Sequence, residues 1–364
     1  MAYERRDVRE LMRSKRQVGM VMDLNKCIGC QSCSVACKTL WTDQPGMENM
    51  WWNNVATQPA KGYPKNWRHL GGGYDENGKM VKGELPELEE YGRAWEFNFN
   101  EVQMSGQGFE KALRPLGAEP RWGPNWEEDQ GGGEWPNAYY FYLPRICNHC
   151  TRPSCVDACP RQALYKREED GIVVLDQERC NGYRLCMEAC PYKKIYWNHL
   201  TKTGQKCIFC YPRIEHGIAP ACARQCPGRL RFLGYLDDED GPVYKLARKW
   251  KVALPLLPQS GCDANVFYVP PLSPPRIDAN GEEIAGESRI PVELLRELFG
   301  HEVERALKTL EAEMAKTRRG ERSELMDILI ARNWHTMFQL GREMQVIPDE
   351  VGMTVPPSSA RGVR

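Results

Sequence analysis

Short apolar stretches in the first two thirds of the chain predict a few strands. Residues 18–23 form an apolar run of strand length. Residues 163–165 and 172–175 flank a polar turn at residues 169–171, and this pattern predicts a β-hairpin. Residues 230–236 predict a further strand. Each of these stretches directly precedes or follows a group of cysteines.

Apolar positions at helical spacing predict helices in the last third of the chain. Two stripes follow the i, i+3, i+4, i+7 pattern, the first after Pro242 and the second with charged residues opposite. The proline-rich residues 270–275 between them predict an extended, rigid connection. The pattern leaves open whether these helices wrap a partner or pack on the chain's own core. The stripes are Val243, Leu246, Ala247 and Trp250, and Val303, Ala306, Leu307, Leu310 and Met314.

Residues 41–137 form a long, weakly periodic stretch that is rich in Gly, Pro and Trp and contains eight of the eleven tryptophans. A stretch of this length is normally either functional or disordered, and its aromatic content argues against disorder. We therefore expect an ordered cap that packs on the rest of the chain or docks on a partner. Packing explains the tryptophans better than electron relay does, because Trp dominates cores and interfaces.

Fifteen of the sixteen cysteines fall into four compact groups, and three of the groups end in Cys-Pro. The Cys-x2-Cys-x2-Cys-x3-Cys spacing is that of bacterial ferredoxins, in which thiolates hold iron–sulfur cubanes. Three closely spaced thiolates bind one cluster, and the fourth ligates the other cluster of a pair. Four groups therefore predict two pairs, hence four clusters. The groups are Cys27, Cys30, Cys33 and Cys37; Cys147, Cys150, Cys155 and Cys159; Cys180, Cys186 and Cys190; and Cys207, Cys210, Cys222 and Cys226.

Two other uses of cysteine fit this spacing less well. Structural zinc sites use separated Cys-x2-Cys pairs rather than three or four cysteines within a dozen residues. Disulfide frameworks belong to small secreted domains, whereas this chain has 364 residues. Soft thiolates in this pattern favour iron–sulfur clusters.

The third group lacks one cysteine, because Tyr183 stands where a ferredoxin run has its second ligand. A phenol is a poor ligand at a soft cluster corner, so we expect one iron to be absent and a 3Fe-4S cluster to form. The alternative is a four-iron cluster with water, hydroxide or another ligand there. Cys262 stands alone and is expected to be an ordinary free thiol. His149 is expected to lie beside a cluster or to face solvent, not to ligate iron.

Charge and composition exclude several function classes. The formal net charge is zero without blocks of like charge, so nothing points to nucleic acid. No run approaches the roughly 18–20 apolar residues that span a bilayer, and the first residues lack the features of a signal peptide. No nucleophile–base constellation or phosphate loop appears. Basic residues near the cysteines are expected either to offset cluster charge or to be ordinary surface residues: Arg145, Lys166, Arg167, Lys193, Lys194, Arg213, Arg224 and Arg229.

With these motifs the chain resembles the iron–sulfur beta subunits of the molybdenum enzymes related to dimethylsulfoxide reductase. It is most similar to the beta subunits of respiratory nitrate reductase, of selenate, chlorate and perchlorate reductases, and of dimethylsulfide and ethylbenzene dehydrogenases. An aromatic residue at the position of Tyr183 is typical of these subunits. The resemblance is carried by residues 21–30 (VMDLNKCIGC), 142–150 (YLPRICNHC), 165–174 (YKREEDGIVV), 206–215 (KCIFCYPRIE), 252–256 (VALPL) and 265–270 (NVFYVP).

The resemblance implies that cysteine groups one and four bind one pair of clusters and groups two and three the other. It implies three 4Fe-4S clusters and one 3Fe-4S cluster, which together use all fifteen grouped cysteines. Lys38 follows Cys37 where the other groups end in proline, which puts only the local turn in doubt. The first cluster would take Cys27, Cys30, Cys33 and Cys226; the second Cys37, Cys207, Cys210 and Cys222; the third Cys147, Cys150, Cys155 and Cys190; and the 3Fe-4S cluster Cys159, Cys180 and Cys186.

The implied fold class is α+β, with two bacterial-ferredoxin-like modules, a long Trp/Gly-rich insertion and a helical C-terminal extension. The expected parts are an N-terminal arm with the first cysteine group at 1–40, the insertion at 41–137, a second ferredoxin-like module at 138–198, the fourth cysteine group at 199–240, which pairs with residues 1–40, and a helical or extended region at 241–364 that docks on another subunit.

The resemblance further implies an electron-transfer subunit that is not catalytic by itself. In a heterotrimer, single electrons would pass along the clusters between an alpha subunit with the molybdenum cofactor, near the first cluster, and a gamma subunit with haem b, near the 3Fe-4S cluster. A periplasmic location is expected, by export with a signal-bearing catalytic subunit; the alternative is cytoplasmic and membrane-associated. Two rival functions are a free-standing polyferredoxin shuttle and the beta subunit of a formate-dehydrogenase-like complex. The substrate and the direction of electron flow are not encoded in this chain.

Overall fold

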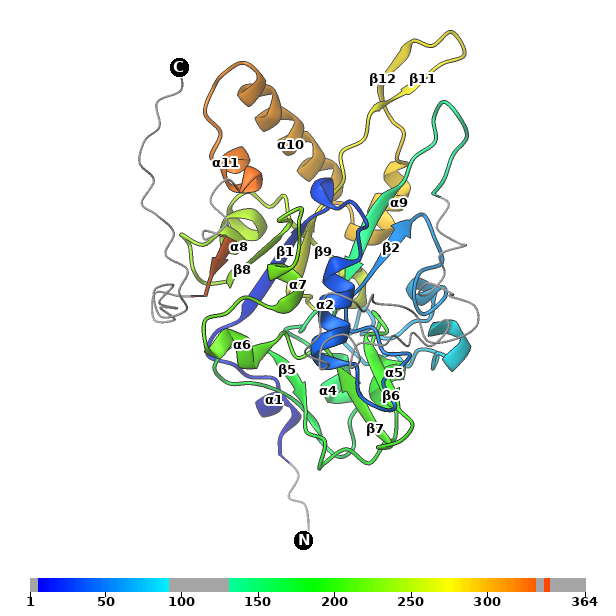
Figure 1. Ribbon diagram of the computed structural model, residues 1–364, viewed down its shortest axis with the longest axis vertical. Helices are drawn as coiled ribbons and strands as arrows, with labels where there is room; N and C mark the ends of the chain where they lie inside the picture. Colours follow the sequence, from blue (N-terminus) through cyan, green and yellow to red (C-terminus); the bar gives the residue numbers. More distant parts are fainter. Residues whose placement is uncertain (1–5, 92–130, 332–336, 341–364) are drawn as a thin grey trace, which may run out of the picture.

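The computed structural model describes residues 6–91, 131–331 and 337–340, which form a mixed α/β structure around a five-stranded sheet (Figure 1). The strand order is β13-β8-β1-β10-β9. β1 pairs antiparallel with β8 and parallel with β10. The strands predicted at 18–23 and 230–236 are therefore confirmed. The bounds are β1 Val18–Asp23, β8 Arg231–Tyr235, β9 Leu254–Pro255, β10 Val266–Val269 and β13 Phe338–Gln339.

The last third of the chain contributes strands that the helical stripes did not predict. β9, β10 and β13 all come from residues 241–364. All four residues of β10 are buried, as the strand lies between β1 and β9. The region predicted as helical or extended therefore also contains strands, and these complete the central sheet.

The two faces of the central sheet bury different partners. Met20 of β1 lies in the core that contains the cysteines, whereas Val21 lies in a second core on the other face, as the alternation of a strand requires. The second core includes Val243, Leu246 and Leu310 from the predicted stripes. The C-terminal helices α8, α10 and α11 therefore pack on the chain's own sheet, and the predicted helices are confirmed. Their bounds are α8 Pro242–Tyr244, which continues into a π-helical turn at Lys245–Lys249, α10 Val303–Arg318 and α11 Glu324–Ile330.

Four two-stranded sheets complete the strands of the described residues. The hairpin predicted at 163–175 is confirmed as β4 and β5. The arm formed by β11 and β12 projects away from the body of the molecule (Figure 1). The pairs are β2 Asn54–Gln58 with β3 Phe141–Arg145, β4 Leu164–Lys166 with β5 Val173–Leu175, β6 Ile195–Asn198 with β7 Thr203–Lys206, and β11 Pro275–Ile277 with β12 Glu283–Ser288.

Short helices carry or flank the cysteine loops. Most of these helices have only one or two turns. The longest of these is α2, Ser32–Trp41. In the part of the chain that the structure describes, none of the helices combines the length and the apolar character needed to cross a bilayer. The remaining bounds are α1 Val8–Leu11, η1 Leu24–Lys26, η2 Trp67–His69, η3 Leu88–Tyr91, α4 Ser154–Asp157, α5 Leu185–Ala189, α6 Tyr211–Glu215, α7 Ala221–Arg224, η6 Pro258–Ser260 and α9 Val292–Phe299.

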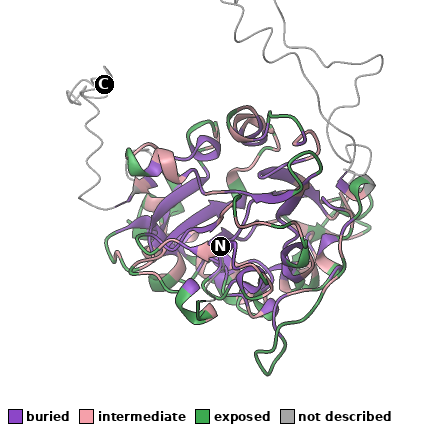
Figure 2. Ribbon diagram, turned by 90° about the horizontal axis from the view of Figure 1, so that it is seen from below, coloured by how far each residue is buried: buried purple, intermediate pink, exposed green. Residues whose placement is uncertain are grey.

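The described parts of the stretch at 41–137 lie partly in the interior. Trp51, Trp52 and Trp67 are buried in the same core as the cysteines, which Figure 2 shows as the purple centre of the molecule. Trp135 is 90% exposed. Trp95, Trp122 and Trp126, which we also expected in the cap, lie outside the described residues.

Candidate iron–sulfur sites

The cysteines lie on short helices and on the loops that lead into them. Cys33 and Cys37 are on α2, and Cys222 is on α7. α2 packs against α7, and α4 against α5, so the first cysteine group meets the fourth and the second meets the third. The loops need left-handed backbone at points where chain and side chains crowd. At Gly29, with φ +66°, a Cβ would lie 2.5 Å from the Tyr142 ring, which only glycine tolerates.

Four buried cysteines from two groups surround one apolar cavity. Cys37 comes from α2, and Cys207, Cys210 and Cys222 come from the fourth group; all four line the cavity. Burial raises the pKa of the Cys37 thiol, and negative charge at Cys207, Cys222 and Cys210 raises it further. The four residues expected to hold the second cluster thus lie together.

A second apolar cavity is lined by the three cysteines expected to hold the 3Fe-4S cluster. They are Cys159, Cys180 and Cys186, and Tyr183 lines the same cavity. The Tyr183 side chain is largely exposed. Two backbone N–H groups are directed at these sulfurs: those of Ala163 and Gly204 donate to Cys159 Sγ and Cys180 Sγ at 3.3 and 3.4 Å.

The cysteines expected for the third cluster are all buried. Burial raises the pKa of Cys155, and negative charge at Cys190 and Cys147 raises it further. Cys150 has Cys262, Cys147 and Cys155 as charged neighbours. These contacts join the second cysteine group to Cys190 of the third.

The cysteines expected for the first cluster lie nearest the surface. Cys27 has Cys33 and Cys226 as charged neighbours, and burial raises its pKa to about 11. Cys30 is exposed and lines a surface groove. Its sulfur lies 3.4 Å from Ser32 Oγ. The described contacts link Cys27, Cys33 and Cys226 directly, and Cys30 lies at the edge of this set.

The cysteine thiols surround cavities and do not converge on a single metal-ion position. Within residues 6–91, 131–331 and 337–340, no three His, Cys, Asp or Glu side chains converge closely enough to hold a single metal ion. Two cavities are nevertheless lined by three and by four cysteines. Because burial raises the pKa of these thiols, for Cys222 to about 12, a positively charged group is needed to hold them as thiolates near neutral pH. A polynuclear iron–sulfur cluster fits this donor set better than zinc, which takes four ligands at one ion.

Three of the fully buried cations point to anionic groups among the cysteines. They are Arg145, Lys194 and Arg231, each at most 1% exposed. No ion pair joins any of them to a carboxylate of the described residues. Arg145 Nε and Nη1 and Arg231 Nε have no hydrogen-bond partner in this part of the chain. An uncompensated buried charge costs several kcal/mol, so these cations fit an interior that holds anionic clusters.

Arg231 shows this compensation most clearly. Its Nη2 donates to Asn53 Oδ1 at 2.8 Å. Burial alone would lower its pKa, but negative charge at Cys222, Cys33, Cys226 and Cys27 raises it above the ordinary value. The guanidinium thus lies between the cysteines expected for the first and second clusters.

Sequence reasoning found only some of the buried cations. Arg145, Lys166, Lys193 and Lys194 were named, and all four are buried. Lys206 and Arg231 were missed, although Lys206 directly precedes a predicted ligand and its Nζ donates to the Cys207 carbonyl at 2.7 Å. Others of the named set are ordinary surface or paired residues: Arg224 and Arg229 are exposed, Arg213 donates to the Ala219 carbonyl, and Arg167 forms ion pairs with Asp170 and Glu215.

Lys38, where the other groups have proline, has a structural role. Its buried ammonium donates to the carbonyls of Met47, Glu48 and Met50 at 2.6, 3.1 and 3.3 Å. The departure from the ferredoxin pattern therefore anchors the loop that follows α2.

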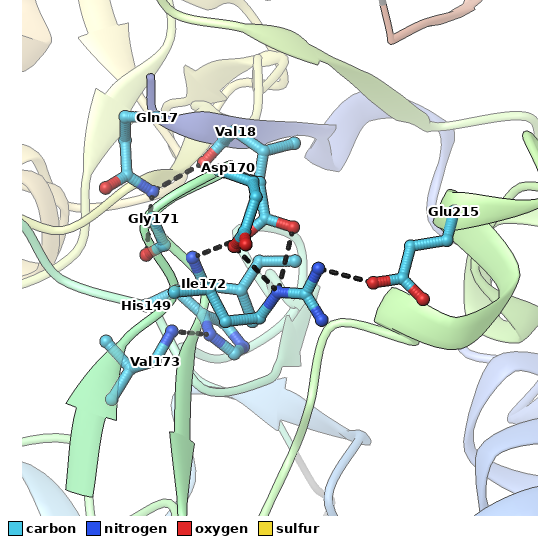
Figure 3. A network of polar contacts seen from close by, with 10 residues as sticks. Gln17, Val18, His149, Asp170, Gly171, Ile172, Val173 and Glu215 are labelled. Carbon is cyan, nitrogen blue, oxygen red and sulfur yellow. Dashed lines mark hydrogen bonds and ion pairs between the residues drawn. The ribbon is translucent and has the colours of Figure 1, made fainter. Parts of the chain in front are cut away.

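His149 is buried beside the β4–β5 hairpin (Figure 3). The Val173 N–H donates to its Nδ1 at 3.1 Å, and its Nε2 has no partner among the described residues. The alternative that it faces solvent is wrong. Beside it, Asp170 pairs with Arg167 at 3.2 Å, and Arg167 pairs with Glu215 of α6. This network ties the β4–β5 hairpin to α6.

Cys262, which is expected to be an ordinary free thiol, is not remote from the other cysteines. It is buried, its Sγ lies 3.5 Å from Ser154 Oγ, and its side chain contacts Cys150. It is a buried thiol beside the third cysteine set.

Trp41→Phe is expected to lower the reduction potential of a cluster held at Cys210. The indole Nε1–H of Trp41 donates to Cys210 Sγ at 3.1 Å, and hydrogen bonds to cluster sulfurs set cluster potentials. We expect a roughly tenfold shift of the equilibrium towards the oxidised form, about 59 mV for one electron, in a redox titration followed by electron paramagnetic resonance (EPR). Trp52→Phe is the control, because Trp52 lines the same cavity but its Nε1 has no partner in the described residues. Equal shifts in both variants would contradict the explanation.

Comparisons with known proteins agree with this chemistry. Residues 138–236 match a family described as a 4Fe-4S dicluster domain. Over 326 residues the chain is 57% identical to the dimethylsulfide dehydrogenase subunit beta of Rhodovulum sulfidophilum, covering 90% of this chain and 99% of that protein. It is 55% identical to the selenate reductase subunit beta of Thauera selenatis, covering 87% and 97%. It is 56% identical to the respiratory nitrate reductase subunit beta of Haloferax mediterranei, covering 89% and 93%.

Proposed function

Because the chain belongs to the family of iron–sulfur beta subunits of molybdenum enzymes related to dimethylsulfoxide reductase, we propose that it relays single electrons between a catalytic subunit with the molybdenum cofactor and a subunit with haem b. Subunits of this family transfer electrons and are not catalytic by themselves. The clusters supply a row of one-electron carriers when bound. The chain's own residues fix their positions and tune their potentials.

We assign three 4Fe-4S clusters and one 3Fe-4S cluster to the fifteen grouped cysteines. The support is the way in which the fold gathers distant cysteines into the expected sets, and the cavities that two of these sets line. The sets are Cys27, Cys30, Cys33 and Cys226; Cys37, Cys207, Cys210 and Cys222; Cys147, Cys150, Cys155 and Cys190; and Cys159, Cys180 and Cys186 for the 3Fe-4S cluster.

The observation that carries the relay is the burial of the four sets. Every cysteine of the second and third sets is buried, whereas the first set has the exposed Cys30 and the last set has the half-buried Cys159 and Cys180. Large apolar side chains are exposed beside both ends, Ile28 at 65% near the first set and Tyr183 at 58% in the last. Two insulated inner carriers between two accessible outer carriers are what a conduit between two partners requires.

We place the catalytic subunit at the end of the first set and the haem subunit at the end of the 3Fe-4S set, as in the family. The location proposed is the periplasm, reached together with a signal-bearing catalytic subunit. Fractionation of cells that express the tagged catalytic and beta subunits together tests this, and recovery of both in the cytoplasm would contradict it.

The test of the proposed function is metal analysis of the chain, purified anaerobically from its host with the proteins that remain bound to it. Iron, molybdenum and haem in stoichiometric amounts are the expected result, with about 15 irons in this subunit. Iron alone, on a chain without partners, would contradict the proposal and favour a soluble ferredoxin-like shuttle.

Tyr183→Cys is expected to convert the 3Fe-4S cluster into a 4Fe-4S cluster. The side chain lines the same cavity as Cys159, Cys180 and Cys186, and a thiolate there supplies the missing soft ligand. Mössbauer spectroscopy and iron content measure the gain, about one iron per chain. Tyr183→Phe is the control, since it provides no ligand. An unchanged cluster in Tyr183→Cys would contradict the 3Fe-4S assignment.

A further inference from the structure

Lys194 at the start of β6 holds a buried ammonium without a carboxylate partner. Its Nζ donates to the Trp51 carbonyl at 2.9 Å, to Asn54 Oδ1 at 2.7 Å and to the Tyr196 hydroxyl at 2.9 Å. These bonds use all three N–H groups of the ammonium. All three acceptors are neutral, so the ammonium has all its hydrogen bonds but no negatively charged hydrogen-bond partner.

The negative charges that act on Lys194 come from two different cysteine sets. Cys37 and Cys207 belong to the second set, and Cys147 belongs to the third. The two sets approach each other through Cys207 and Cys147, which are charged neighbours. Lys194 therefore lies at the junction between the two inner sets, where an electron crosses from one half of the core to the other.

The surroundings of Lys194 favour an electrostatic effect of its charge on both the second and the third cysteine set. Burial lowers the pKa of the ammonium, the neighbouring Arg145 lowers it further, and the thiolates at Cys207, Cys37 and Cys147 raise it. A charge in a dry interior acts more strongly than one in water. The first and last sets have accessible cysteines, so solvent screens their charges more.

We propose that the ammonium of Lys194 sets the reduction potentials of the second and third clusters together, and so matches the two inner carriers to the outer ones. This rests on the proposed cluster assignment. A fixed positive charge stabilises the added electron on either cluster, and no bond is made or broken. Because both inner potentials rise together, the step between them keeps its driving force. The step into the inner pair becomes more favourable, and the step out of it becomes less favourable by the same amount.

The test compares variants of the assembled complex in redox titrations followed by EPR. Lys194→Gln removes the charge and is expected to shift both inner clusters towards the oxidised form, each roughly tenfold or about 59 mV, with smaller shifts at the outer clusters. Lys194→Arg keeps the charge and is expected to leave both reduction potentials at their values in the unmodified complex. Tyr196→Phe removes one acceptor and keeps the charge, so it is expected to leave them unchanged.

Asn54→Asp gives a second test that does not depend on removing Lys194. The substitution is isosteric and places a carboxylate at the acceptor that Lys194 contacts at 2.7 Å. It is expected to lower both inner potentials, as Lys194→Gln does. If neither variant shifts the two potentials, or if Tyr196→Phe shifts them as much, the ammonium is only a structural anchor and the proposal is overturned. Fewer than four clusters in the unmodified complex would instead overturn the proposed function.

Discussion

Cys37→Ser is expected to remove the second cluster and to stop electron passage between the two ends of the chain. Cys37 is the proposed ligand on α2 in a set whose other members come from the fourth cysteine group, and a serine oxygen is a hard, poor replacement at a soft cluster. Loss of this cluster interrupts the row of carriers at an inner position. It also removes part of the negative charge beside Lys194 and Arg231, and a buried charge that loses its compensation costs up to about 3–5 kcal/mol in the free energy of unfolding.

Iron content and electron transfer from a donor at one end of the complex to an acceptor at the other measure this effect. Cys262→Ser is the matched control, because Cys262 is an equally buried cysteine outside the fifteen proposed ligands. It is expected to retain all four clusters and the electron-transfer rate. A Cys37→Ser complex with four clusters and an unchanged rate would contradict the assignment of Cys37.

Removal of all iron is expected to unfold the chain rather than leave a native apoprotein. The interior holds the cations Arg145, Lys194 and Arg231, and thiols such as Cys222, with a pKa of about 12, are neutral near pH 7 when nothing is bound. Each uncompensated buried charge costs several kcal/mol, against a total stability of about 5–15 kcal/mol for a typical domain. Ligation and folding are therefore coupled.

Near-ultraviolet circular dichroism of the buried tryptophans and hydrogen exchange measure the loss of structure after anaerobic iron removal. Lys194→Met is the control, because it is expected to have opposite effects on the stability of the iron-loaded and the iron-free chain. It is expected to destabilise the iron-loaded chain, where it removes a compensating charge, and to increase protection from exchange in the iron-free chain, where that charge is uncompensated. An iron-free chain with native dichroism and a cooperative unfolding transition would contradict the coupling.

The parts of the fold that sequence could predict are those with a local signal. β1, the β4–β5 hairpin and β8 each have an apolar run of strand length beside turn residues or cysteines. β10 has an equally apolar run at Val266–Val269, but the proline-rich segment after it and the helical stripes around it suggested an extended connection. Its parallel pairing with β1 joins distant parts of the chain, and such pairing leaves no mark on neighbouring residues.

The residues of the candidate sites also divide into those that have a local sequence signal and those that do not. Cysteine spacing predicts a set of ligands, because a cluster needs several thiolates within reach of one loop, and this assignment stays a prediction. The cations that surround the sites were harder to predict. Arg231 lies on a strand whose five residues are all buried, and sequence alone argues against a buried charge there; its place follows only once the anionic clusters are included in the core. Trp41 was predicted as packing, and its bond to Cys210 depends on a tertiary contact between the end of α2 and the loop before α6.

Diffraction at the iron absorption edge from crystals of the intact complex tests the cluster assignment. We predict four separate iron clusters in this subunit, in a row that begins at the Cys27, Cys30, Cys33 and Cys226 set and ends at a three-iron cluster held by Cys159, Cys180 and Cys186. Single metal ions at the cysteines, or clusters held by other combinations of cysteines, would contradict it.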